Sequence, residues 1–208
     1  MKNILFDMDG VLVDYQPAIR VNHIATKLQR SAAEVHAAIY ASGVEAEADA
    51  GRLRPDEYLE AIGAMMGVPL PVEVWTEARR LATRARPGLI GHISSLASRG
   101  TGVAILTNNG RLLAAHWEDI VPELFPLFRG RAHVAAEFGV AKPDPGVYIA
   151  VLERLGWRAE DTLFIDDAQA NVDGAVAAGM AARRCDSEAG VGDAMAAFID
   201  GPGIAGRP

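Results

Sequence analysis

The chain lacks the features typical of secreted, membrane-bound and nucleic-acid-binding proteins. Its only cysteine is Cys185, so no intramolecular disulfide can form and a reducing compartment is expected. No apolar run approaches the length of a membrane span, and the chain begins directly with an expected strand, without a signal-peptide pattern. A formal net charge of -7 argues against nucleic acid or an anionic membrane as the main partner. We therefore expect an acidic protein of the cytoplasm.

Short apolar runs alternate with helical segments along most of the chain. The expected strands are 3–6, 102–106, 162–165 and 181–184. The expected helices are 89–97, 112–120, 145–155, 169–178 and 193–198. Strands that are apolar throughout are buried on both faces, as in a parallel sheet with helices on each side. The sequence therefore predicts an α/β fold with a doubly wound parallel sheet.

The segment 15–86 interrupts this alternation, because it has no convincing strand and much helical pattern. Ser31 and Glu34 form a capping box, and Pro55 and Pro71 are each followed by acidic residues, as at helix starts. These signals predict four or five short helices. The expected domains are an α/β core of residues 1–14 and 87–208 and an inserted helical domain of residues 15–86.

Polar residues follow three of the expected strands at the point where each strand ends. They are Asp7 and Asp9, Thr107 and Asn108, and Asp166 and Asp167. Each pair alone could be a turn or a helix cap. Ligands of open parallel sheets, however, bind at the carboxyl ends of the strands. Four carboxylates together with hydroxyl and amide groups therefore predict a site for a hard cation, most naturally Mg²⁺.

Lys142 precedes another expected helix, of which Asp144 would be the N-cap and Pro145 the first residue. A lysine at this end opposes the helix dipole, so helix stability does not explain it, and its removal is expected to cost little stability. A bound phosphate would explain it, since the lysine and the helix end both attract anions. The alternative is a solvated loop lysine.

Two carboxylates spaced like Asp7 and Asp9, a magnesium ion and a lysine together suggest phosphoryl transfer through an aspartyl-phosphate. A carboxylate that attacks an anionic phosphate needs charge neutralisation, which the metal and the lysine would supply.

In their order along the chain, these residues resemble the four motifs of the haloacid dehalogenase-like hydrolase superfamily. The matching stretches are 7–11, 106–108, 142–143 and 164–167. The resemblance covers nearly the whole chain and implies a Rossmann-like core with an α-helical cap inserted after the first strand. Within the superfamily, the third and fourth motifs look like those of the branch that contains sugar-phosphate phosphatases and the phosphatase domain of soluble epoxide hydrolases.

The resemblance implies a Mg²⁺-dependent phosphatase acting on a small phosphorylated metabolite. Asp7 would attack phosphorus and bind the metal. Asp9 would protonate the leaving alcohol and then activate water, while its backbone carbonyl binds the metal. Thr107 and Asn108 would bind phosphate, and Lys142 would bridge Asp7 and phosphate.

For the fourth motif, the resemblance implies that Asp167 is the main metal ligand and that Asp166 binds the metal directly or lies behind it. Many relatives carry a further acid at the position of Asn171. An amide there could still orient a water on the metal, with lower metal affinity.

Three other activities share parts of this pattern. A sugar-phosphate mutase would use the same core. A 2-haloacid dehalogenase would need neither Asp9 nor the pair of Asp166 and Asp167. A receiver-like phosphoacceptor domain carries its acidic pair first and its phosphorylated aspartate later, the reverse of the order here. Polar candidates for substrate contact in the cap are Arg20, His23, Glu45 and Arg52.

Overall fold

The computed structural model describes residues 1–125 and 127–201 and has the predicted α/β fold. Its main sheet is parallel, with five strands in the order β5-β4-β1-β6-β7. The strands are β1 (Asn3–Phe6), β4 (Gly102–Thr107), β5 (Ala132–Val134), β6 (Thr162–Asp166) and β7 (Ala181–Arg184). Every residue of β1, β4 and β6 is buried, which accounts for their uninterrupted apolar sequences.

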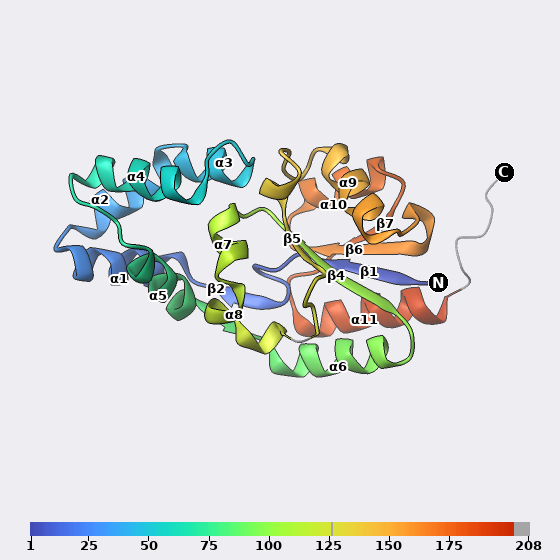
Figure 1. Ribbon diagram of the computed structural model, residues 1–208. Coiled ribbons are helices and arrows are strands. Elements are labelled where there is room, and N and C mark those ends of the chain that lie inside the picture. The colour runs from blue at the N-terminus through green and yellow to red at the C-terminus, as the bar shows by residue number, and fades with distance from the viewer. Residues whose placement is uncertain (126, 202–208) are drawn as a thin grey trace.

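Helices cover both faces of this sheet, α9 and α10 on one face and α6 and α11 on the other (Figure 1). These helices are α6 (Pro87–Ser98), α9 (Pro145–Leu155), α10 (Gln169–Ala177) and α11 (Glu188–Asp200). The last helix begins earlier than predicted, because the Ser187 hydroxyl accepts a bond from the backbone N–H of Gly190 and caps it. The predicted helix 112–120 is two short helices, α7 (Arg111–Ala115) and α8 (Trp117–Ile120), which separate at His116.

The two faces of the sheet bury separate sets of side chains. Ile4 and Phe6 of β1 point into the larger cluster, where Phe6 meets the edge of Phe128. Leu5 points the other way and packs with Tyr148 and Phe164. Successive strand residues face opposite sides, so a strand between two helical layers contributes to both cores. Each of these fully buried side chains stabilises the fold by about 1.5–3 kcal/mol.

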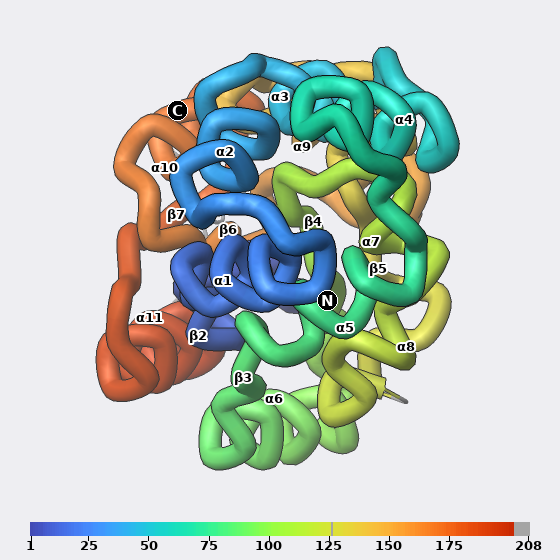
Figure 2. Tube along the Cα trace, turned by 90° about the vertical axis from the view of Figure 1, so that its left-hand side faces the viewer, coloured from blue at the N-terminus to red at the C-terminus, as the bar shows by residue number. Residues whose placement is uncertain are grey.

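The helices inserted between β1 and α6, for which we keep the name cap as a label, lie at the end of the sheet toward which β1 runs, opposite the N-terminus of the chain (Figures 1 and 2). These helices are α1 (Pro17–Leu28), α2 (Ala32–His36), α3 (Val44–Asp49), α4 (Pro55–Met66) and α5 (Val72–Ala82), with a π-helical turn at Ala37–Ala41. The predicted capping box is present, since Ser31 and Glu34 bond to each other's backbone N–H groups. Helix α4 starts at Pro55 as predicted.

Three short strands were not predicted. β2 (Val13–Tyr15) and β3 (Thr83–Ala85) form an antiparallel ribbon where the chain enters and leaves the cap. The expectation of no strand in 15–86 is therefore wrong for β3. The third is the edge strand β5 (Ala132–Val134). Each has only three residues, too few to show a periodicity, and each depends on a partner distant in sequence.

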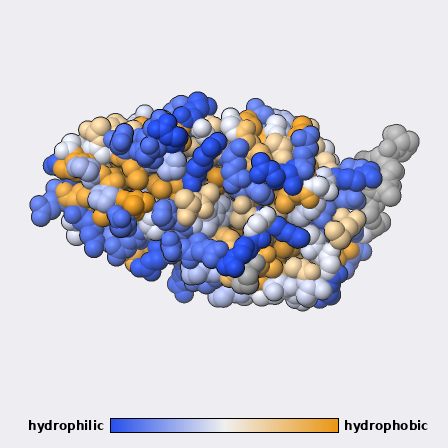
Figure 3. Space-filling view, viewed as in Figure 1, coloured by the Kyte–Doolittle hydropathy of each residue, from blue (hydrophilic) through white to orange (hydrophobic). Residues whose placement is uncertain are grey.

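None of the described helices combines the length and the apolarity that crossing a bilayer requires. The surface of the cap nevertheless carries hydrophobic groups among its polar side chains (Figure 3). The most exposed are Met65 at 54 % and Leu81 at 43 %.

Candidate active site

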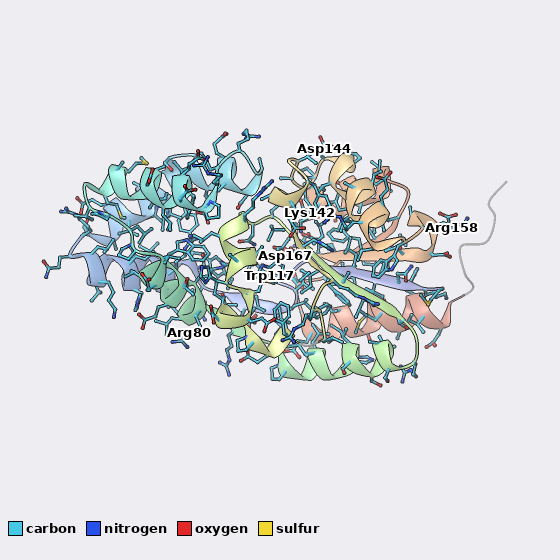
Figure 4. All side chains as sticks on the ribbon, viewed as in Figure 1. Arg80, Trp117, Lys142, Asp144, Arg158 and Asp167 are labelled. Atoms are coloured by element: carbon cyan, nitrogen blue, oxygen red, sulfur yellow. The ribbon has the colours of Figure 1, made fainter. Side chains whose placement is uncertain are left out.

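The carboxyl ends of three neighbouring strands place the predicted site residues at one edge of the sheet. Asp7 follows β1, Thr107 ends β4 and Asp166 ends β6. The backbone N–H of Asp7 still donates to Ile165 O at 2.9 Å, so the β1–β6 pairing fixes this turn. Figure 4 shows Lys142, on the loop before α9, and Asp167 at the end of the sheet that faces the cap.

Lys142 is buried among carboxylates. Its Nζ donates to Asp7 Oδ1 and to Asp166 Oδ2, both at 2.7 Å, and the residue is 4 % exposed. These contacts exclude the solvated-loop interpretation. Asp144 caps α9 as predicted, by accepting from the Gly146 N–H at 2.8 Å.

Asn108 holds the lysine loop in place. Its side-chain Nδ2 donates to Lys142 O at 2.8 Å, and its Oδ1 accepts from the Lys142 N–H at 2.9 Å. Both the nitrogen and the oxygen of this side-chain amide are thus hydrogen-bonded to the backbone of Lys142. The side chain of Asn108 therefore positions the lysine, and a phosphate contact from this side chain remains a prediction.

Burial and mutual repulsion govern the protonation of this cluster. Burial, opposed by Lys142 and reinforced by Asp166, raises the pKa of Asp7 to about 7. Burial alone would lower the pKa of Lys142, but attraction to Asp7 and Asp166 raises it above its ordinary value. Burial and the charge of Asp166 raise the pKa of Asp167. The cluster therefore has more negative charge than its one ammonium group can balance.

The donor set fits a divalent cation. Asp7, Asp166 and Asp167 each offer a carboxylate oxygen, and these atoms lie within 4.8 Å of one another. Gly10 adopts φ +83°, and a Cβ there would stand only 2.5 Å from Asp167 Oδ2, so a glycine is needed beside this carboxylate. Oxygen ligands of this kind suit Mg²⁺.

Asp166 and Asp167 differ in the hydrogen bonds that their carboxylates accept from the rest of the protein. Asp166 is fully buried, and its oxygens accept from Lys142 and from the Ala168 N–H. Asn171 Nδ2 also reaches both of its oxygens at 3.0 Å. In the described chain, the Asp167 carboxylate accepts no such bond. Asp167 is therefore the carboxylate most available to a metal, and Asn171 orients Asp166.

The carboxylate of Asp9 bonds to a residue of the cap and is not part of the cluster of Asp7, Asp166 and Asp167. Its Oδ2 accepts from Arg79 of α5 at 2.5 Å and from Asn109 Nδ2 at 3.2 Å. Asn109 also donates to the hydroxyl of Thr107 at 2.9 Å. Arg79 is 2 % exposed, and its guanidinium carbon lies 3.8 Å from the ring centroid of Tyr15. A residue of the cap therefore holds a predicted catalytic carboxylate of the core.

Arg79 and Asn109 were not among the predicted site residues. Asn109 directly follows Thr107 and Asn108, which were both predicted. Arg79 could have been suspected from its helix, because it shares the buried face with Trp75, Ala78 and Ala82. A charged residue in such an apolar stripe needs a buried partner.

The four polar residues predicted to contact substrate from the cap divide into two groups. Arg20 NH1 donates to Glu45 Oε1 at 2.7 Å, and both residues face the interior of the cap. His23 pairs with Glu77 at 3.2 Å. Arg52 is an exposed residue that pairs with Glu47. The structure thus brings together Arg20 and Glu45 and leaves His23 and Arg52 in separate pairs.

Known proteins resemble the chain in both sequence and structure. The model of the haloacid dehalogenase-like hydrolases matches residues 1–179. A sesquiterpene phosphatase of Aspergillus oryzae is 28% identical over 86% of this chain and 87% of its own length. A phosphoglycolate phosphatase of Pseudomonas putida is 26% identical over 85% of this chain and 66% of its own length. A HAD family enzyme of Bacteroides thetaiotaomicron, solved with magnesium and inorganic phosphate, has TM-score 0.72 at 21% identity and covers 88% of this chain and 93% of its own.

Proposed function

This chain belongs to the haloacid dehalogenase-like hydrolase family, and we propose that it is a Mg²⁺-dependent phosphatase of a small phosphate monoester, acting through an aspartyl-phosphate. The observation that carries the proposal is the position of Lys142, buried and bonded to Asp7 beside two further carboxylates. The relatives named as phosphatases and the neighbour solved with magnesium and phosphate support it.

In the first half of the reaction, a carboxylate oxygen of Asp7 attacks phosphorus and the bond from phosphorus to the leaving oxygen breaks. Lys142 holds Oδ1 at 2.7 Å, which leaves the other oxygen to attack. The ammonium offsets the repulsion between carboxylate and phosphate. Asp7, Asp166 and Asp167 would hold Mg²⁺, which supplies further charge neutralisation when bound.

Asp9 moves the proton in both halves of the reaction. It donates a proton to the leaving alcohol and later takes one from the water that attacks phosphorus. That attack breaks the bond between phosphorus and Asp7, releases inorganic phosphate, restores the carboxylate of Asp7 and leaves Asp9 protonated again, ready for the next cycle. Asn109 and Arg79, which bond to Asp9 Oδ2, would set the direction of the carboxylate.

The test is phosphate release by the purified protein from a panel of phosphorylated sugars, polyols, nucleotides and small acids with Mg²⁺. Chelation should abolish the release and Mg²⁺ should restore it, and rapid acid quenching should trap phosphate covalently on Asp7. A sugar-phosphate mutase would instead return the phosphate to the sugar without releasing it. Full activity after exhaustive chelation would contradict the proposal. The cytoplasmic location stays a prediction.

A further inference from the structure

A small cavity lies between cap and core, and one of the residues that line it, Asn109, also contacts Asp9. Its volume of about 20 Å³ gives room for about one water. The core side is formed by residues 109–113, and Asn109 also donates to Asp9 Oδ2 at 3.2 Å. The cap side is formed by Glu45, Ala48, Asp49, Leu53, Tyr58 and Trp75. A leaving group that takes a proton from Asp9 therefore has this cavity as its neighbour.

Asp49 is the one charged cap residue at this cavity that lacks a partner in the described chain. Arg20 pairs with Glu45, which also accepts from Tyr58, and Arg79 pairs with Asp9. The Asp49 carboxylate takes part in no hydrogen bond or ion pair among the described residues, and it is partly buried. Burial, reinforced by the charge of Glu45, raises its pKa to about 8.

The charges around the cavity disfavour leaving groups of either sign. A carboxylate would face the acids Asp49 and Glu45, and an ammonium group would face Arg111 on the core side of the cavity. A hydroxyl group has neither conflict, because it can donate to Asp49 and accept from Trp75. The indole Nε1 of Trp75 is buried and has no hydrogen-bond partner in the described chain. A hydroxyl also matches a cavity that holds about one water.

The cap is seated firmly at this point, so the cavity has defined walls. A Cβ on Gly51 would overlap the carbonyl oxygen of Ala136 in the core, and a Cβ on Gly110 would stand 3.3 Å from the Cβ of Ala48. Close approach of this kind fixes the end of α3, which carries Asp49, against the strand-end loops of the core.

We infer that the substrates are phosphate monoesters of short, neutral alcohols that carry a second hydroxyl next to the ester, and that Asp49 is the residue that selects this hydroxyl. The inference rests on the proposed phosphatase activity. It names a class of leaving group and a specificity-determining residue of the cap.

Four esters of similar length test the class: 2-hydroxyethyl, ethyl, 2-aminoethyl and carboxymethyl phosphate. They present a hydroxyl, a hydrogen, an ammonium and a carboxylate at the same place. Asp49 is mostly protonated at neutral pH. A hydrogen bond between uncharged groups is worth about 0.5–1.5 kcal/mol, so kcat/KM for the hydroxyethyl ester should exceed that for the ethyl ester by about 2- to 10-fold. The two charged esters should be no better than the ethyl ester.

Variants of Asp49 test whether this residue causes the preference for the hydroxyethyl ester over the ethyl ester. Asp49→Ala should lower kcat/KM for the hydroxyethyl ester by about 2- to 10-fold and leave kcat/KM for the ethyl ester unchanged. Asp49→Asn should keep part of the preference, because the amide oxygen still accepts a hydrogen bond. The matched control is Glu60→Ala, which removes an exposed carboxylate of α4 and should change neither ester. The Asn variant also serves if the Ala variant does not fold.

Several outcomes overturn the inference. They are equal kcat/KM for the hydroxyethyl and ethyl esters, a preference for either charged ester, or an equal effect of Asp49→Ala on both neutral esters. Hydrolysis of an aryl phosphate with none of the four esters turned over would also overturn it. No hydrolysis of any phosphate is instead a failure of the proposed function. In that case, calorimetric binding of the hydroxyethyl and ethyl esters to Asp7→Asn, with and without Asp49→Ala, decides the inference separately.

Discussion

Buried charge is arranged differently in the core and in the cap. In the core, the carboxylates of Asp7, Asp166 and Asp167 surround one ammonium group, that of Lys142. The excess is negative. Burial, the largest cause, and then the charge of Asp166 raise the pKa of Asp7 to about 7 against the attraction of Lys142. Such a cluster is costly unless a cation joins it.

The charges in the interior of the cap are paired one to one. Arg20 pairs with Glu45, Arg79 pairs with Asp9 of the core, and burial raises the pKa of Asp49 to about 8, so Asp49 is mostly uncharged at neutral pH. Under the proposed function, this difference separates the roles of the two regions. The core would hold a cation and move a phosphoryl group, whereas the cap would receive an uncharged group. Changes in the core should therefore act on every substrate, and changes in the cap should act on the choice among substrates.

The largest effect is expected from Asp7→Asn. An amide cannot attack phosphorus at a useful rate, so kcat should fall to background, by about 10⁵-fold or more as for other lost nucleophiles. Steady-state phosphate release and acid trapping of the phosphoenzyme measure both consequences. Asp193→Asn, which changes an exposed aspartate of α11, is the control and should behave as wild type. Wild-type turnover by Asp7→Asn would remove the aspartyl-phosphate from the mechanism.

The next effect is expected from Lys142→Ala. It removes the cation that bonds to Asp7 and Asp166 at 2.7 Å, so kcat/KM should fall by about 10²-fold or more for every substrate. Lys142→Arg should restore only part, because the planar guanidinium does not reproduce a compact ammonium. Lys27→Ala, at a half-exposed lysine paired with Glu77, is the control. Near-normal kinetics in Lys142→Ala would mean that the ammonium does not face the reacting atoms.

The structure also changes the stability expected for Lys142→Ala. From the sequence, the lysine opposes a helix dipole and its loss should cost little. In the structure, its loss leaves Asp7 and Asp166 buried without their cation. We now expect a lower melting temperature for the metal-free variant, since breaking a buried pair is destabilising. A thermal melt beside Lys27→Ala measures the difference.

Much of the fold could be predicted because its strands are buried on both faces. β1 and β7 match the predicted bounds, and β4 and β6 each extend one residue further. A parallel sheet brings its strand-end residues to one edge, which is why the sequence alone could place Asp7 and Asp166 together. The fold class and the family both follow from this regularity.

The cap contacts could not be predicted in the same way. Arg79 is 70 residues from Asp9 in sequence, and they meet only because the β2–β3 ribbon returns the chain to the core. Asp49 has no motif around it; its role depends on how α3 sits against the loop after β4. Pairing across a domain boundary has no local period, so sequence patterns do not report it.

A smaller effect is expected from Arg79→Ala, which tests whether the cap positions a core residue. Asp9 would lose the guanidinium at 2.5 Å, and kcat should fall by about 10-fold or more while KM changes less, since misplacement of a catalytic group can cost up to about 10²-fold. Arg79→Lys should recover part of the loss. The neighbouring Arg80, exposed and directed away from the site in Figure 4, gives the matched control Arg80→Ala. A rise in KM alone would make Arg79 a substrate contact.

The smallest effect concerns the free energy of unfolding, which ionisation of the buried Asp49 carboxyl group lowers. Burial and Glu45 raise its pKa from 3.8 to about 8, so between these pH values the folded state binds more protons than the unfolded state. The free energy of unfolding must then fall as pH rises through this window. Asp49→Asn removes the titrating carboxyl group, so the free energy of unfolding of the variant should lack the decrease with pH that this group causes. The variant should be more stable than wild type at about pH 8, and the advantage should shrink to nothing toward about pH 4.

Thermal melts across that range measure the difference, at about 2–4 °C per kcal/mol for a chain of this size. Glu60→Gln is the control, because Glu60 is an exposed carboxylate of the same domain and its variant should follow the wild-type curve in parallel. If Asp49→Asn also ran parallel to wild type, the Asp49 carboxylate would be solvated in the folded protein. A solvated carboxylate would satisfy its hydrogen bonds with water, and the cap would then have no unmatched acceptor with which to select a hydroxyl.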